Sequence, residues 1–438
     1  MNLESYLERM TTVNPIQAVG CVTRVSGLIV ESQGPSVKVG SVCSIDPGEG
    51  LPKIRAEVIG FNQERALLMP LEEIRGVASG SRVAAEDQDA ATDVGRGLLG
   101  RVIDGLGSPI DGKGPVAAEA RYPIYANPVN PLSRRRIRNP LDTGIRALNG
   151  LLTIGCGQRI GIFAGSGVGK STLLGMIARQ SKADVNVVAL IGERGKELND
   201  FIEKDLGEEG LRRSVVVVAT SDKPPLIRMR GAFIATAIAE FFRDRGAQVI
   251  LMMDSVTRFA MAQREVGLAA GEPPTTRGYT PSVFTLLPRL LERAGTSSGT
   301  GSITGLYTVL VEGDDMNDPI ADATRGILDG HAVLSRGLAD GNHYPAIDIL
   351  ASISRTMIDV VKPEHKKHAG RLKEVLATYG RVEDLINIGA YAAGSSPEID
   401  YAVSMKARID AYLRQDIHET IDFDASVRQL AALFEKGR

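Results

Sequence analysis

The chain has 438 residues, a formal net charge of −2, and 43% hydrophobic and 24% charged residues. That balance is ordinary for a globular protein of about three domains, and it argues against general adhesion to nucleic acid or a membrane surface. No basic-then-apolar signal peptide begins the sequence, and no apolar run approaches the ~20 residues that span a bilayer. We therefore expect a cytoplasmic, reducing location. The three cysteines, Cys21, Cys43 and Cys156, form no CxxC pair or Cys/His cluster, so neither a zinc site nor a disulfide framework is predicted.

Residues 1–15 begin with an amphipathic pattern. MNLESYLERM places Leu3, Tyr6, Leu7 and Met10 at helical spacing, with charged residues between them. So short a helix is marginal unless it is docked. It can pack on its own domain or on a partner, and the pattern alone leaves both open.

Residues 16–89 consist of short β-branched runs separated by turn-forming residues. The runs are VTRVSGLIVESQG, PSVKVGSVCSI, IRAEVIGF, RALLMPL and SRVAAE. Strands at this spacing predict a small antiparallel β-barrel. We find no catalytic pattern in this region.

From residue 90 to residue 364 the pattern is that of alternating strands and helices. Buried strands are predicted at QRIGIFAG, VNVVALIG, SVVVVAT, AQVILMMD and LYTVLVEG, and helices at STLLGMIARQ and PLIRMRGAFIATAIAEFFRDRG. This alternation predicts an α/β domain with a mainly parallel sheet. Strand signals then stop, and residues 365–438 are predicted to form a small α-helical C-terminal domain.

One dense basic run, SRRRIR, occupies residues 133–138 between Pro131 and Pro140. Such a run is usually a solvated linker or a locally paired cluster. Contact with a partner or with nucleic acid is the other interpretation, and the sequence does not decide between them.

The segment AGSGVGKST, residues 164–172, fits the phosphate-loop (Walker A) pattern, except that Ala164 stands where the strict pattern has glycine. Its glycines allow the backbone to curl with N–H groups pointing inward, and the following helix N-terminus completes an anion cradle. Lys170 is expected to reach the β- and γ-phosphates of ATP, and Ser171 to ligate Mg²⁺. The predicted nucleotide-binding residues of this loop are Gly165, Ser166, Gly167, Val168, Gly169, Lys170, Ser171 and Thr172.

Two carboxylates follow other buried strands. Asp254 ends VILMMD, as in the Walker B motif, where the carboxylate holds Mg²⁺; capping of the next helix is the structural alternative. Glu193 follows VVALIG, and the carboxyl ends of strands line the ligand crevice of an α/β sheet. Alone, Glu193 would be read as a surface carboxylate. Beside the other two motifs, it is predicted to orient and polarise the attacking water.

Taken together, these motifs resemble the catalytic subunits of rotary ATP synthases and their export relatives. The matching segments include LLGRVIDGLGSPIDGKGP, PLDTGIRALNGLLTIGCGQRIGIFAGSGVGKST, LIGERGKELNDF and MMDSVTRFAMAQREVGLAAGEPP. The resemblance extends over nearly the whole chain from about residue 20. Within that group, EGDDMNDPIADATRGILDGHAVLSR and HYPAIDILASISR look most like the flagellum-specific ATPases of type III protein export. The virulence-type secretion ATPases are the alternative.

The resemblance implies roles for four further residues. Arg258 matches an arginine near the γ-phosphate, and Tyr344 matches an aromatic residue on the adenine ring, with a core or loop tyrosine as its alternative. Gln415 would approach the base from the C-terminal domain. Arg355, in DILASISR, matches the arginine finger that a neighbouring subunit supplies, with a buried ion pair as its alternative. Such a finger contributes roughly 10³ to 10⁵ in rate, so we expect an isolated subunit to bind ATP but hydrolyse it slowly.

The resemblance also implies architecture and partners. An N-terminal β-barrel, a RecA-like nucleotide domain and a helical C-terminal domain would assemble into a homohexameric ring, peripherally associated with the inner-membrane export apparatus. Residues 1–15 correspond to a segment that binds a dimeric, stator-like regulator, although the segment is short here. A shaft-like coiled-coil export protein would pass through the pore near GLAAGEPPTTRGY. Export substrates, their chaperones and the membrane export gate are the other expected partners.

Two other functions are weighed against this one. A RecA-like nucleic-acid motor would carry aromatic and basic RNA-binding positions in its barrel, but Phe61 is the only aromatic residue between residues 16 and 88. A non-hydrolysing scaffold would lack a catalytic carboxylate, and non-catalytic rotary subunits typically carry glutamine where Glu193 stands. The sequence therefore favours a Mg²⁺-dependent ATPase that promotes protein export, with no nucleic-acid partner.

Overall fold

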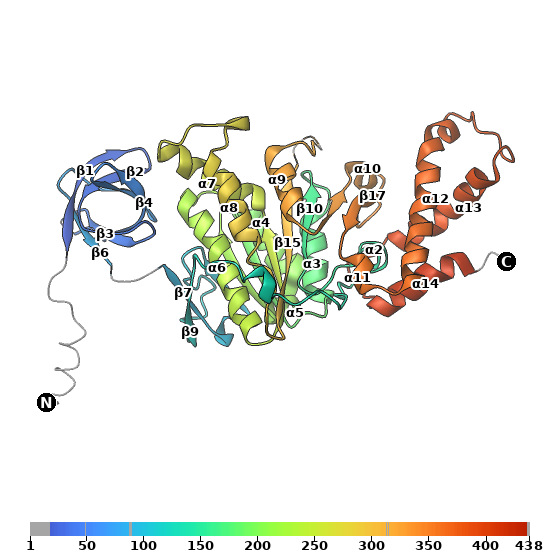
Figure 1. The fold of residues 1–438 in the computed structure, drawn as a ribbon, viewed down its shortest axis with the longest axis horizontal. Coiled ribbons are helices and arrows are strands. Elements are labelled where there is room, and N and C mark those ends of the chain that lie inside the picture. Colours follow the sequence, from blue (N-terminus) through green and yellow to red (C-terminus); the bar gives the residue numbers. More distant parts are fainter. Residues whose placement is uncertain (1–17, 49, 87–89, 312, 314, 436–438) are drawn as a thin grey trace. The chain divides into compact units, whose positions relative to one another are not determined.

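The computed structural model describes residues 18–48, 50–86, 90–311, 313 and 315–435 (Figure 1). The amphipathic segment predicted at residues 1–15 lies outside them. The chain divides into two compact units. The first contains the residues up to Ala91 together with Pro224–Ile227 and Ala262–Pro281, and the second contains Thr92–Lys223, Arg228–Met261 and Ser282–Arg438.

The first unit contains the predicted antiparallel barrel. Its strands are β1 (Val19–Ser26), β2 (Ile29–Gln33), β3 (Val42–Asp46), β4 (Ile54–Asn62), β5 (Arg65–Pro70) and β6 (Arg82–Ala85). They pair in the closed order β1-β2-β5-β4-β3-β6, with β6 returning to β1. Closure removes the unpaired strand edges, and alternate apolar residues such as Val30, Ile45 and Leu68 fill the interior. The barrel prediction is confirmed.

The second unit is built on one large sheet. Its strands are β8 (Arg101–Asp104), β10 (Arg159–Ala164), β11 (Val185–Ile191), β12 (Ser214–Ala219), β13 (Gln248–Asp254), β14 (Gly295–Thr296), β15 (Ser302–Leu310), β16 (Gly330–Leu334) and β17 (Ile347–Ser354). They lie in the order β17-β16-β10-β15-β13-β11-β12-β8, with β14 paired to β15. The neighbours from β16 to β8 are parallel, whereas β17 joins the edge antiparallel to β16. Two short strands, β7 (Ala91–Val94) and β9 (Ala120–Pro123), pair separately.

Helices of the second unit separate these strands along the chain. They are α2 (Arg146–Leu151), α3 (Lys170–Gln180), α4 (Gly195–Asp200), the π-helix η3 (Phe201–Leu206), α5 (Gly207–Arg212), α6 (Pro225–Asp244), α7 (Val256–Ala269), α8 (Pro281–Leu291), α9 (Pro319–Ile327), α10 (Arg336–Asp340) and α11 (Met357–Val360); α6, α7 and α8 each include residues assigned to the first unit. All five strands predicted for this region are present. β11 and β12 are buried along their whole length, which is why their sequences are continuous apolar runs.

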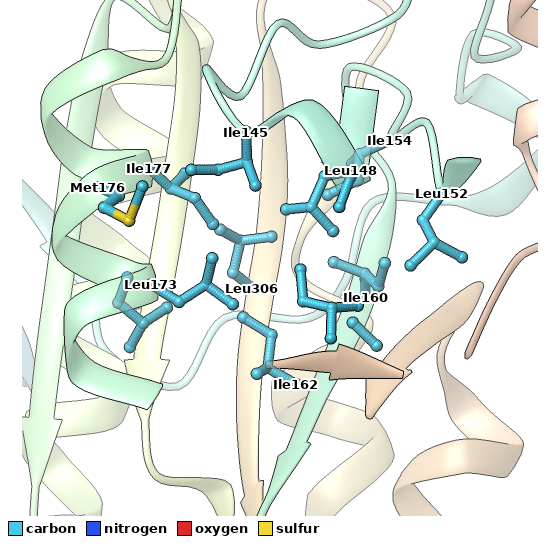
Figure 2. Packing of buried hydrophobic residues seen from close by; sticks show 14 of the residues in the cluster. Ile145, Leu148, Leu152, Ile154, Ile160, Ile162, Leu173, Met176, Ile177 and Leu306 are labelled. Carbon is cyan, nitrogen blue, oxygen red and sulfur yellow. The ribbon is translucent and has the colours of Figure 1, made fainter. Parts of the chain in front are cut away.

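The core beside the phosphate loop joins helices to strands. Figure 2 shows Leu173, Met176 and Ile177 of α3 facing Leu306 of β15, with Ile162 of β10 close by. These side chains are buried. Burying a large aliphatic side chain stabilises a fold by about 1.5–3 kcal/mol, so this core holds the start of α3 in place.

The helical region predicted after residue 365 is also present. It comprises α12 (Pro363–Asn387), α13 (Pro397–Leu413) and α14 (Phe423–Glu435). Tyr412 of α13 donates from its hydroxyl to the carbonyl of Ser426 in α14 and to that of Arg146 in α2. These contacts join the helical region to the nucleotide-binding core. The domain boundaries at residues 15, 89 and 364 stay predictions.

Among the described residues, no helix is both long enough and apolar enough to cross a membrane.

Candidate active site

A pocket of about 530 Å³ lies at the carboxyl ends of the central strands. The loop after β10, Glu193 after β11, the end of β15, Arg258 of α7 and Arg336 of α10 line it. Ligands of open α/β sheets bind at this edge. The structure thus brings the predicted phosphate loop together with Lys170, Glu193 and Arg258.

The phosphate loop needs glycine at two positions. Gly167 has φ +79° and Gly169 has φ +86°, in the left-handed region that side chains disfavour. Gly169 is the N-cap of α3, which begins at Lys170, so the free N–H groups of the first helical turn are available to an anion. Val168 differs from its neighbours because its side chain is buried in the core, which leaves only its backbone to serve the loop.

The position of Ala164 in β10 explains why alanine can stand where the strict motif has glycine. It is the last residue of β10, where it pairs with Leu310 of β15 and Leu334 of β16. A residue inside a parallel strand has ordinary extended geometry, so the position does not require glycine.

Lys170 and Glu193, which line the pocket, form a compact group of charges with Asp254, which is outside the lining. The Lys170 Nζ atom is 2.5 Å from Asp254 Oδ1 and 3.8 Å from Glu193 Oε1. The Thr308 hydroxyl donates to the same Asp254 oxygen over 2.7 Å. Only 12%, 14% and 5% of the Lys170, Glu193 and Asp254 side chains are exposed, so solvent screens these charges weakly.

Glu193 is set apart by its electrostatics. Burial raises its pKa to about 7, and the Asp254 charge and a hydrogen bond with Glu197 act in the same direction. Lys170 opposes the shift. The buried Oε1 atom of Glu193 has no hydrogen-bond partner among the described residues, and an unsatisfied buried acceptor favours a polar ligand or water. A carboxylate with a pKa near neutrality is suited to general base work.

Three charged residues of the pocket were missed from the sequence. Arg194 and Glu197 line it immediately beyond Glu193, and their position in GERGKE, on the turn that carries Glu193, could have indicated them. Arg336 had no such local signal. Its Nη2 atom donates to the Ser166 carbonyl over 3.2 Å, and it reaches the loop because β16, which precedes it, lies beside β10.

Tyr344 lies beside the loop and Gln415 does not. The exposed Tyr344 ring is so close to Gly169 that a Cβ there would lie 3.3 Å from it. Gln415 is buried; its Oε1 accepts from the Arg146 N–H, and its Nε2 donates to the carbonyls of Gly144 and Glu419. Its own N–H donates to the Tyr344 carbonyl. Gln415 therefore contacts the backbone of Tyr344 but does not line the pocket. A contact between Gln415 and the nucleotide stays a prediction.

Arg355 lies outside the pocket of its own chain. It follows the edge strand β17 directly, and its N–H donates to the carbonyl of Asp329. Its side chain is exposed, and no carboxylate within the described part of the chain lies close enough to form an ion pair with it. The alternative of a buried ion pair therefore does not describe this residue. Leu350, Ile353 and Ile358, close to it in sequence, are 50%, 46% and 61% exposed, an unusual grouping for large apolar side chains.

The sequence matches known domains along most of its length. The profile of the ATP synthase alpha/beta family nucleotide-binding domain matches residues 144–354, and that of the family's beta-barrel domain matches residues 22–86. The profile of the T3SS EscN ATPase C-terminal domain matches residues 361–432. The matched ranges correspond to the sheet from β10 to β17, most of the barrel, and the helical region described above.

Full-length relatives agree with the domain matches. The flagellum-specific ATP synthase of Bacillus subtilis (strain 168) is 52% identical over 440 residues, covering 99% of each chain, and the type 3 secretion system ATPase of Xanthomonas euvesicatoria is 50% identical over 432 residues, covering 98% of each. The assembled ATPase EscN of the enteropathogenic E. coli type III secretion system is 45% identical, with a TM-score of 0.88 over 94% of this chain and 99% of that one. EscN in complex with its central stalk EscO gives a TM-score of 0.87 at the same coverage. The chain therefore belongs to the ATP synthase alpha/beta family, as a homologue of its flagellar and type III secretion ATPases.

Proposed function

We propose that this chain hydrolyses ATP to ADP and phosphate, as a ring, and thereby promotes flagellar type III protein export. The observation that carries the proposal is the group formed by Lys170, Glu193 and Asp254 beside the phosphate loop. A phosphate loop alone supports nucleotide binding. The Glu193 carboxylate, with an unsatisfied Oε1 and a pKa raised to about 7, supports hydrolysis.

Nucleotide binding changes the partner of Lys170. Its ammonium group, now 2.5 Å from Asp254, turns to the β- and γ-phosphates and leaves the carboxylate free. Ser171 and Asp254 would then hold Mg²⁺ together with the nucleotide. These residues fit that ion, because they offer a hydroxyl and one carboxylate beside the phosphate loop, and Mg²⁺ usually takes one or two carboxylates plus phosphates. The chemistry that the ion would supply there is neutralisation of phosphate charge.

The ionised form of Glu193 orients a water molecule toward the γ-phosphorus and accepts its proton. A bond forms from the water oxygen to phosphorus, and the bond to the oxygen that bridges the β- and γ-phosphates breaks, so ADP leaves. Arg258, which lines the same pocket, stabilises the γ-phosphate oxygens. Tyr344, beside Gly169, packs on the adenine ring, and Gln415 supports Tyr344 through its backbone hydrogen bond.

Arg355 completes the site of a neighbouring copy. Its side chain is exposed after the edge strand β17 and does not line the pocket of its own chain. Burial of the exposed apolar side chains near it in sequence against a neighbouring copy would be favourable in free energy. In the interface it stabilises the negative charge of the transition state, an effect of roughly 10³ to 10⁵ in rate. The known assembly of the related EscN ATPase supports a homohexameric ring for this chain.

A mixing experiment tests the shared site. Arg355→Ala and Glu193→Gln chains should each release almost no phosphate from ATP. Rings reconstituted from both should regain activity, because some interfaces pair an intact Glu193 with an intact Arg355. Two differently tagged Glu193→Gln preparations, mixed in the same way, are the control. No recovery in rings that mass photometry shows to be mixed would argue against sharing.

The flagellar assignment rests on similarity. Flagellum-specific and type 3 secretion relatives are nearly equally similar, at 52% and 50% identity, so the virulence-type system is the alternative. The complex of EscN with its stalk EscO supports a shaft-like partner in the pore. A stator-like regulator at residues 1–15, export substrates with their chaperones, and the membrane export gate complete the proposed partners, at the inner face of the cytoplasmic membrane.

A deletion strain separates the two systems. Without the gene, secretion of flagellar filament protein and swimming should be lost. The wild-type chain should restore both, and the Glu193→Gln chain should not. Normal motility with loss of another secreted protein set would assign the chain to the virulence-type system instead.

A further inference from the structure

A second cavity, of about 480 Å³, lies at the amino ends of the central strands. Gln248 begins β13 and Ser302 begins β15, and both line it. Its outer wall is the basic run of the sequence, with Arg135, Arg136 and Arg138. The nucleotide pocket is at the opposite strand ends, on the order of 20 Å away for a strand of β13's seven residues at about 3.3 Å each.

The basic run is fixed against the core at both ends. The Thr296 hydroxyl donates to the Arg135 carbonyl over 2.6 Å, and the Arg135 N–H donates to the Ser297 carbonyl. At the other end, the Cys156 N–H donates to the Asn139 carbonyl over 2.9 Å. The backbone of the run is therefore anchored beside the cavity, while the side chains of Arg135, Arg136 and Arg138 are exposed.

Nearby carboxylates neutralise other arginines. Arg159 forms ion pairs with Asp329 and Glu292, and Arg134 donates to the Glu292 carbonyl and lies 3.9 Å from its carboxylate. Asp184 accepts from the Gln248 N–H but is outside the cavity lining. No carboxylate of the described residues is within 4.0 Å of the three arginines that line the cavity.

We propose that this cavity binds a ligand carrying two phosphate groups. Guanidinium groups bind phosphate through paired, charge-assisted hydrogen bonds, and the lining contains three of them and no carboxylate. A cavity of 480 Å³ is within the usual ~300–1,000 Å³ of small-molecule sites. A soluble bisphosphate and a lipid with two separate phosphates in its headgroup share this chemistry.

Binding is measured with the nucleotide pocket filled. The full chain is saturated with Mg²⁺ and ADP and titrated with fructose 1,6-bisphosphate, a soluble bisphosphate that chelates Mg²⁺ weakly, by isothermal titration calorimetry. A parallel arm measures co-sedimentation with phosphatidylcholine vesicles that contain or lack cardiolipin, a lipid with two phosphates. Binding in either arm supports the site and identifies the source of the ligand. Binding in neither overturns the proposal.

Variants show whether the cavity is responsible. Arg136→Gln/Arg138→Gln should weaken binding by about tenfold or more for each arginine removed. Arg136→Lys/Arg138→Lys keeps the charge and should lose less. The matched control, Arg289→Gln/Arg428→Gln, removes two other exposed arginines and should bind like the wild type. Equal losses in the control and cavity variants would show nonspecific attraction and reject the site.

A test on the unaltered chain avoids any folding defect. Cys156 lines the cavity, whereas Cys21 is exposed on the barrel. With Mg²⁺ and ADP present, the ligand that binds should slow alkylation of Cys156 by iodoacetamide about tenfold at ten times its dissociation constant. Cys21 should react at an unchanged rate. Equal reactivity of Cys156 with and without a saturating ligand would overturn the proposal.

Discussion

The central sheet has one cavity at the carboxyl ends of its strands (the carboxyl edge) and one at their amino ends (the amino edge). The two cavities are similar in volume and differ in the charges that line them. The pocket at the carboxyl ends, about 530 Å³, is lined by Lys170 and Glu193, which lie close to the buried Asp254. The amino-edge cavity, about 480 Å³, has only arginines as its charged lining, and all three are exposed. Both can attract phosphate. Only the first contains a carboxylate whose pKa burial has raised, and a base of this kind is what hydrolysis needs beyond phosphate binding.

The largest expected effect is that of Lys170→Ala, which should change ATP hydrolysis at the carboxyl edge but not ligand binding at the amino edge. Lys170→Ala removes the cation of the phosphate loop and should reduce ATP hydrolysis by about 10³-fold or more, since one lost donor to developing charge already costs 10²–10³. Bisphosphate binding at the amino edge should be unchanged. Lys182→Ala, which removes a lysine that is 71% exposed, is the control. If Lys170→Ala also abolished bisphosphate binding, the two sites would not be independent.

Glu193→Gln tests the carboxylate with a raised pKa, which only the carboxyl-edge pocket contains. It should leave nucleotide binding intact and reduce phosphate release by about 10²-fold or more. In the wild type, the rate should fall as pH is lowered through about 7, because protonation of Glu193 removes the base. A phosphate-release assay across pH 5.5–8.5 measures this. A flat profile would exclude Glu193 as the titrating base.

Glu193→Gln should lower the rate of hydrolysis but raise the free energy of unfolding. Because the pKa of Glu193 rises from 4.5 to about 7 on folding, its contribution favours the folded state at low pH and is lost as pH rises through 7. Without nucleotide, Glu193→Gln should therefore stabilise the fold at pH 8 by about 1–3 kcal/mol and much less at pH 5. Thermal unfolding at both values measures the difference, and equal effects would contradict the raised pKa.

Arg336 tests how the phosphate loop is held. Removing its hydrogen bond to the Ser166 carbonyl in Arg336→Ala should raise the KM for ATP by about tenfold, the size expected for one charge-assisted hydrogen bond. Arg336→Lys should recover part of the loss. A fall in kcat with unchanged KM would instead place the arginine in the transition state.

Ala164→Gly should have the smallest effect. It restores the strict phosphate-loop pattern, but glycine inside a strand costs about 0.5–1 kcal/mol relative to alanine. We expect slightly lower stability in chemical denaturation and an unchanged rate of hydrolysis. Faster hydrolysis would show that Ala164 limits the loop.

Features defined by a local pattern were predictable. The barrel strands, the buried parallel strands and the phosphate loop follow from residue order, because alternation, apolar runs and glycine spacing are read over a few residues. Glu193 and Asp254 were found because strand ends of a parallel sheet meet at one edge. Arg336 was missed because only the pairing of β16 with β10 brings it to Ser166.

The amino-acid sequence by itself determined the chemistry that this chain can perform: a glycine loop with Lys170 for phosphates and two acids at the ends of apolar strands. Tertiary structure decided which charges are compensated. It paired Lys170 with Asp254 and raised the pKa of Glu193 by burial. It left Arg355 exposed after the edge strand β17. It also placed three arginines of SRRRIR around a cavity, while the neighbouring acids Glu292 and Asp329 lie beside Arg134 and Arg159. The reason is physical, since the energy of a charge depends on distance and solvent access, and both are set by residues far apart in the chain.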